Sequence, residues 1–196
     1  LALLIMALFG SAFVAGKVVL NTSVPPILFG SLRLLIVLIC LIPFWRFKIP
    51  SKKYIFPLII FSLSMGVGVT MCTYLALNAS SIVSPVIIGS QLTVPFAIIL
   101  SSLFINEKIS YKKWFFVLSA FAGIVLIGFD PKLVDNTLAL FLTTLMALFY
   151  SIANVSSRKI KNINIVITNG FMALTGLVVL IILSYIFEGD PLENIK

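Results

Sequence analysis

Long apolar runs separated by short polar segments leave this chain few folds to adopt. A helix needs roughly 20 apolar residues to cross the hydrocarbon core of a bilayer. Seven stretches reach or approach that length: residues 1–20, 26–46, 54–77, 82–105, 112–129, 137–157 and 164–187. Lipid permits only helices or closed barrels, and the period-two alternation of barrel strands is absent. We therefore predict an all-α fold, a polytopic transmembrane helix bundle.

The composition excludes a water-soluble globule. Apolar residues make up 61% of the 196-residue chain, and charged residues only 10%. Soluble domains carry about 45–50% and about 25% of these two classes. A globule of this size could not hide so much apolar surface from water, so the lipid bilayer is the expected surrounding.

Positive charge alternates between successive connections. Most of the 14 basic residues lie in the even-numbered connections, as Arg46, Lys48, Lys52, Lys53, Lys108, Lys112, Lys113, Arg158, Lys159 and Lys161. The odd-numbered connections and the trailing segment are neutral or acidic. By the positive-inside rule, we expect the even-numbered connections and the N-terminus to be cytoplasmic. Because these cations form small groups at helix ends and no contiguous tract, we expect no nucleic-acid partner.

A short internal repeat divides the chain. Residues 6–13, MALFGSAF, return as residues 146–153, MALFYSIA, and Gly30 meets Gly170 at the same offset. Five spans lie in one period, so the second copy would enter the membrane from the opposite side. Such inverted repeats are common in secondary transporters. We predict a first five-helix repeat over 1–129 and the first two helices of an incomplete second repeat over 130–196, which three further spans would complete.

Several short motifs also occur in a distinctive order. They are FGSAF at 9–13, Pro25-Pro26 with LRLL at 32–35, Ser84-Pro85, QLTVP at 91–95, FINEKI at 104–109, Trp114 and AGIVLI at 122–127. This order resembles the EamA-type family of the drug/metabolite transporter superfamily, with Phe9 where tryptophan is usual. The resemblance implies ten helices in two inverted repeats that move small metabolites across a cytoplasmic (inner) membrane. Among members of the family, the chain resembles bacterial exporters of cysteine-pathway metabolites through Pro25-Pro26, Leu32-Arg33 and the helix that contains Gln91.

The leading hypothesis is therefore an exporter of a small-molecule substrate that works by alternating access, with cargo held near the midplane. A non-transporting helical membrane subunit that supports a partner complex is the alternative, and a homodimer is an assembly that the sequence leaves open. An enzyme acting on lipids would need a nucleophile–base pair or metal ligands. The chain has no histidine and no acidic residue within a predicted span, so we expect no catalytic residue, metal or cofactor.

Two ionisable side chains fall inside the predicted spans, where charge is costly and so marks candidate function. Arg33 lies seven residues into the second span, roughly 10 Å deep at about 1.5 Å per residue. We expect it to bind the carboxylate of an anionic or zwitterionic cargo, or else to snorkel to the interface. Lys17 lies about one turn from the outer end of the first span, where snorkelling and cargo contact are again the alternatives.

Polar uncharged residues gather on the third and fourth spans. Tyr74, Gln91 and Thr93 are predicted to contact the substrate, with ordinary interhelical hydrogen bonding as the alternative. Pro95 removes one backbone hydrogen bond and should free the Gln91 carbonyl, which predicts a hinge beside a polar pocket.

Small residues occur within several of the predicted spans. Gly66 and Gly68 in the third span predict close helix packing. Cys40 and Cys72 both fall within apolar runs, and we expect them to be buried as small apolar side chains without a disulfide.

Overall fold

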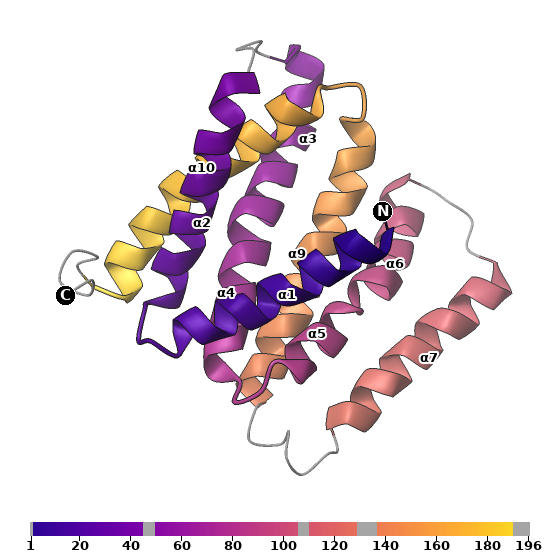
Figure 1. Cartoon of the computed structure of the whole chain (residues 1–196). Coiled ribbons are helices and arrows are strands. Elements are labelled where there is room, and N and C mark those ends of the chain that lie inside the picture. The colour runs from indigo at the N-terminus through magenta and orange to yellow at the C-terminus, as the bar shows by residue number, and fades with distance from the viewer. Residues whose placement is uncertain (1, 45–49, 106–109, 129–136, 190–196) are drawn as a thin grey trace.

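The computed structural model describes residues 2–44, 50–105, 110–128 and 137–189, and these residues form a bundle of helices (Figure 1). Within them, five stretches are long and apolar enough to cross a membrane: Pro26–Phe44, Lys52–Ala79, Ser84–Phe104, Thr137–Lys159 and Ile165–Phe187. The helices α1 (Ala2–Leu20) and α7 (Tyr111–Gly128) cover the other two predicted runs. The predicted all-α polytopic bundle is confirmed.

The first two helices meet in a tight turn. After α1 ends, Ser23 takes a positive φ of 67°, and α2 (Pro26–Leu41) begins at the second of two prolines. Pro26 occupies the first helical position, where its missing N–H costs no helical hydrogen bond. A short 3₁₀ segment, η1 (Ile42–Phe44), extends α2.

The third span is one helical rod with an irregular centre. It consists of α3 (Lys52–Ser62), the π-helical segment η2 (Leu63–Val69) and α4 (Thr70–Ala79). A Cβ added at Gly66 would lie 2.6 Å from the Met172 carbonyl oxygen, and one at Gly68 would lie 2.5 Å from the Phe149 ring. The backbone of η2 therefore lies directly against two neighbouring helices, in agreement with the close packing predicted at these glycines.

The fourth span is interrupted, and the sixth runs through the middle of the bundle. The fourth consists of α5 (Ser84–Ser90) and α6 (Thr93–Ile105). The long helix α9 (Thr137–Lys159) packs against α3, η2, α4, α5 and α6, whereas α10 (Ile165–Phe187) runs along α2 (Figure 1). The α9 helix is therefore the element around which the third and fourth spans assemble.

The connections that the structure describes lie at two opposite ends of the bundle. The turns 21–25 and 80–83 lie at one end, and the α9–α10 turn and the start of α3 lie at the other (Figure 1). This arrangement agrees with the alternation on which the topology prediction rests. Arg46, Lys48, Glu107 and Lys108 lie outside the described residues, as do 129–136 and 190–196.

One carboxylate joins the end of α10 to the start of α2. Glu188 Oε1 accepts a hydrogen bond from the Ile27 N–H at 2.7 Å, and its Oε2 accepts from the Leu28 N–H at 3.0 Å. The Ser184 hydroxyl donates to Oε2 at 2.8 Å. The first N–H groups of a helix have no intrahelical acceptor, so an anion placed there stabilises the helix end.

The two cysteines differ in their surroundings. Cys72 is buried as predicted, whereas Cys40 is exposed, so the prediction was wrong for Cys40. Cys40 lies four residues after Ile36, on the same face of α2, and Ile36 is 63% exposed. An apolar outer face of this kind suits lipid contact, and a small side chain there needs no protein cover.

Candidate functional site

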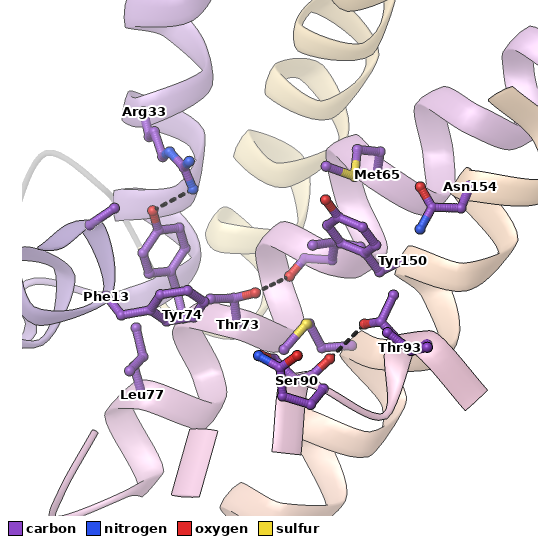
Figure 2. Close-up of a pocket in the computed structure, with 15 residues that line it drawn as sticks. Phe13, Arg33, Met65, Thr73, Tyr74, Leu77, Ser90, Thr93, Tyr150 and Asn154 are labelled. Atoms are coloured by element: carbon purple, nitrogen blue, oxygen red, sulfur yellow. Dashed lines mark hydrogen bonds between the residues drawn. The ribbon is translucent and has the colours of Figure 1, made fainter. Parts of the chain in front are cut away.

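A cavity of about 400 Å³ lies in the bundle and is bordered by parts of five spans (Figure 2). Ligand pockets usually measure about 300–1,000 Å³. The lining residues are Ala12, Phe13, Arg33, Met65, Val69, Thr73, Tyr74, Leu77, Ser90, Gln91, Thr93, Val94, Met146, Tyr150 and Asn154. The cavity therefore combines an apolar wall with polar groups drawn from otherwise apolar helices.

Arg33 and Tyr74 meet at one side of this cavity. Arg33 Nη1 donates a hydrogen bond to the Tyr74 hydroxyl oxygen at 3.1 Å (Figure 2). The Tyr74 ring is 5% exposed and packs edge-on against Phe29, with ring centroids 4.8 Å apart. A Cβ added at Gly30 would lie 3.1 Å from this ring, so the absence of a side chain at Gly30 lets α2 approach α4. These contacts hold the phenol in one orientation.

The fourth span breaks at Gln91 and Leu92, beside the cavity. The Val94 N–H donates to the Gln91 carbonyl oxygen at 3.1 Å, so the prediction that this carbonyl is free was wrong. Because α5 ends before Gln91, the chain forms a tight turn there, closed by this hydrogen bond between residues three apart. Pro95 lies in the first turn of α6. A proline in that turn displaces no helical partner. The role of Pro95 as a hinge stays a prediction.

Three hydroxyl groups of the lining donate their protons locally. Thr73 Oγ1 donates to the Val69 carbonyl at 2.6 Å, Ser90 Oγ to the Ile87 carbonyl at 2.6 Å, and Thr93 Oγ1 to the Ser90 carbonyl at 2.7 Å. A hydroxyl that has donated its proton keeps two lone pairs. Toward a molecule in the cavity, these three oxygens therefore act as hydrogen-bond acceptors.

The interrupted region between α5 and α6 also contacts α9. The Ser151 hydroxyl, which is fully buried, lies 2.9 Å from the Thr93 carbonyl oxygen and 2.7 Å from the Ala147 carbonyl of its own helix. A Cβ added at Gly89 would lie 2.7 Å from Thr143 Cγ2. Close packing thus holds the end of α5 and the start of α6 against the central helix.

Four of the five predicted substrate-contacting residues line the same cavity: Arg33, Tyr74, Gln91 and Thr93. Lys17 does not. Its ammonium group donates to the Leu77 carbonyl at 2.9 Å and to the Ser80 carbonyl at 2.7 Å, at the C-terminal end of α4. A cation is favourable beside the unpaired carbonyls of a helix end, so Lys17 joins α1 to α4.

The sequence reasoning missed the contribution of α9. Tyr150 and Asn154 line the cavity from this helix. They are four residues apart and so share a helix face; polar residues within an apolar run were also the signal in the third and fourth spans. Met65 and Met146 carry no comparable signal, because nothing distinguishes a cavity-lining methionine from one that faces lipid or core.

The cavity lining carries little charge. Among the lining residues that the structure describes, Arg33 is the only charged side chain. The described residues contain no group of three or more His, Cys, Asp or Glu side chains that could hold a metal ion. The arrangement is therefore suited to non-covalent binding of a small molecule with a negatively charged group.

Comparisons with known proteins show that the chain is similar to transporters. The profile of the EamA-like transporter family matches residues 1–129. A Bacillus subtilis (strain 168) protein described as the uncharacterized transporter YoaV is 34% identical over 195 residues, covering 94% of this chain. This chain spans 65% of the length of that relative. No solved structure matches the chain.

Proposed function

This chain belongs to the EamA-like transporter family, and from that premise we propose that it carries a small metabolite across the cytoplasmic membrane by alternating access. The cargo occupies the cavity between the spans of the predicted first repeat and α9. Arg33, Tyr74, Gln91 and Thr93 contact it, and no catalytic step is involved. Export is the proposed direction, because the segments around Pro25-Pro26, Arg33 and Gln91 resemble bacterial exporters.

The observation that carries this proposal is the cavity itself. Its polar groups come from spans that are otherwise apolar, and unpaired polar groups are costly at membrane depth. A bundle that only supports a partner would gain nothing from placing a guanidinium, two amides and several hydroxyls around a space of about 400 Å³. Binding of a cargo that enters and leaves the cavity would explain why these polar groups line it.

Two features of the fold would allow the cavity to open alternately. The third span contains the π-helical segment η2, and the fourth is interrupted between α5 and α6. Irregular helical segments are frequent at functional sites, and non-helical backbone at membrane depth is tolerated where it borders a cavity. We propose Pro95 as the hinge residue because it lies in the first turn of α6 after the interruption.

Flux through proteoliposomes tests the proposal. Purified protein is reconstituted and the efflux of radiolabelled amino acids, organic acids and nucleosides is compared with that from empty vesicles. Ala12 and Ala15 are both exposed on α1, but only Ala12 lines the cavity. We expect at least one compound to move, Ala12→Trp to abolish its flux, and Ala15→Trp to preserve it. Absence of flux for the whole panel would favour the non-transporting subunit.

The proposed orientation, with the N-terminus in the cytoplasm, is tested by thiol labelling in whole cells. In a background of Cys40→Ser and Cys72→Ala, single cysteines are introduced as Lys52→Cys at one end of the bundle and Asn21→Cys at the other. We expect a membrane-impermeant reagent to label the second variant directly. The first should react only after the cells are permeabilised, and direct labelling of that variant would reverse the topology.

A further inference from the structure

The cavity has two chemically different sides. Figure 2 shows Arg33 and Tyr74 at one side, and Ser90 and Thr93 at the other, with Thr73 between them. The first side offers hydrogen-bond donors and a positive charge, and the second offers the hydroxyl oxygens whose protons are already donated locally. A bound molecule must match both sides at once.

The Arg33 side suits a planar anion. The guanidinium carries five N–H donors in a fixed fork, which matches a carboxylate through two parallel bonds. One of these donors is used by the Tyr74 hydroxyl oxygen. Among the residues that the structure describes, no acceptor is shown for the Tyr74 proton, so the phenol can donate to the same anion.

The charge of the lining limits the ligand to one negative charge. No second cation and no carboxylate line the cavity within the described residues. A dianion such as a phosphate monoester would leave one charge uncompensated in the cavity, and an amine without an acid group would face Arg33 with the same sign. Both arrangements are costly at membrane depth.

The opposite side suits a hydrogen-bond donor. The Ser90 and Thr93 oxygens present lone pairs there. Elsewhere the lining is apolar, with Phe13, Met65 and Met146 among its residues. Methionine sulfur and aromatic rings pack favourably with one another, so a ring can fill the middle. The two polar groups of the ligand are therefore separated by an apolar body, and this separation distinguishes it from molecules whose polar groups are adjacent.

We propose that the cavity binds an organic monoanion whose carboxylate pairs with Arg33 and Tyr74 and whose far end donates a hydrogen bond to the hydroxyl oxygen of Ser90 or Thr93. This inference rests on the transport function proposed above, since it names the chemical class of the cargo. It adds that the two ends of the cargo are recognised separately, one by charge and one by hydroxyl oxygens.

Three probes with the same body test it: 3-(4-hydroxyphenyl)propanoate, its amide 3-(4-hydroxyphenyl)propanamide, and 3-phenylpropanoate. Their dissociation constants are measured with the full chain in lipid nanodiscs. We expect the hydroxylated acid to bind at least about tenfold more tightly than its amide, because a charge-assisted pair is lost in the amide. It should also bind several-fold more tightly than 3-phenylpropanoate, since one hydrogen bond is missing there.

Single substitutions test which side of the cavity causes each difference in probe affinity. Arg33→Gln should remove the preference for acid over amide, whereas Arg158→Gln, outside the cavity, should keep it. Ser90→Ala should reduce the preference for the phenol over the unsubstituted ring, whereas Ser119→Ala on α7 should not. Because each result compares two probes on one variant, partial loss of folded protein does not obscure it.

The outcomes also separate this inference from the transport proposal. Equal affinity of the wild-type chain for acid and amide, no binding of any probe, or an intact acid preference in Arg33→Gln would overturn the ligand class. Flux of some other compound in proteoliposomes would leave transport standing in that case. Binding of the hydroxylated acid without flux of any compound would instead support the ligand class and contradict transport.

Discussion

Arg33 on α2 and Tyr74 on α4 are joined by a hydrogen bond of 3.1 Å from the guanidinium Nη1 to the phenol oxygen. The bond holds one edge of the guanidinium and leaves the rest of the fork available. Tyr74 is itself held by Phe29 and by the close approach of Gly30. A flexible cation is thereby given a preferred orientation before any ligand binds, which reduces the entropy that binding must overcome.

Tyr74→Phe removes only the hydroxyl from this arrangement. We expect the affinity for 3-(4-hydroxyphenyl)propanoate to fall roughly five-fold, since one hydrogen bond contributes about 1 kcal/mol. The ring packing against Phe29 should survive, so the thermal stability should change little. Tyr185→Phe is the matched control, because Tyr185 is exposed and lies outside the cavity. Unchanged affinity in Tyr74→Phe would show that the phenol does not take part in binding.

Lys17→Met separates a structural lysine from one that contacts cargo. The substitution keeps an unbranched side chain of similar bulk but leaves the Leu77 and Ser80 carbonyls without their cation. We expect the free energy of unfolding to fall by roughly 1–2 kcal/mol and the probe affinities to stay within two-fold. The readouts are the apparent Tm in detergent and the dissociation constants, with the exposed Lys53→Met as control. Weaker binding at unchanged Tm would instead return Lys17 to the substrate site.

Gly66→Ala tests the backbone contact between η2 and α10. Alanine favours helix by up to about 1 kcal/mol over glycine, but its Cβ would lie 2.6 Å from the Met172 carbonyl oxygen and 3.2 Å from Gly176 Cα. Both neighbours are backbone atoms that cannot rotate away. We expect a net loss of about 1–3 kcal/mol, measured as a lower apparent Tm.

Gly10→Ala gives the opposite case on α1. Nothing lies within 4 Å of a Cβ added at Gly10, so the gain in helix propensity should not be offset by a clash. Its Tm should hold or rise. Equal Tm values for Gly66→Ala and Gly10→Ala would mean that the third span is free to move away from α10.

The spans could be predicted from the sequence because their signal is local. A run of about twenty apolar residues must be helical in lipid whatever it packs against. The π-helical form of η2 could not be predicted, since it accompanies contacts with Met172 and Phe149, roughly a hundred residues away along the chain. The interruption at Gln91 was only half predicted: Pro95 signalled an irregularity, but not that the Val94 N–H would satisfy the Gln91 carbonyl.

The site shows the same division between local and distant information. Arg33, Tyr74, Gln91 and Thr93 stood out because polar groups in apolar runs are costly, and they do line one cavity. The partners of Lys17 could not be foreseen, because backbone carbonyls at the end of another helix carry no residue-specific signal. Tyr150 and Asn154 could have been found by their four-residue spacing, although not the fact that α9 brings them to the third span.

Glu188→Gln tests the connection between the end of α10 and the start of α2. The amide keeps the size of the side chain but loses the negative charge that faces the Ile27 and Leu28 N–H groups. Anions at a helix N-terminus contribute about 0.3–1 kcal/mol at exposed sites and up to about 2 kcal/mol when partly buried. Glu188 is half-buried, so we expect the free energy of unfolding to fall by roughly 1 kcal/mol, measured as a lower apparent Tm.

Ser184→Ala is the comparison variant. It removes one donor to the same carboxylate and leaves both backbone bonds, so its effect on the Tm should be smaller. If Ser184→Ala lowers the Tm more than Glu188→Gln does, then the serine packing and not the carboxylate holds the two helices together.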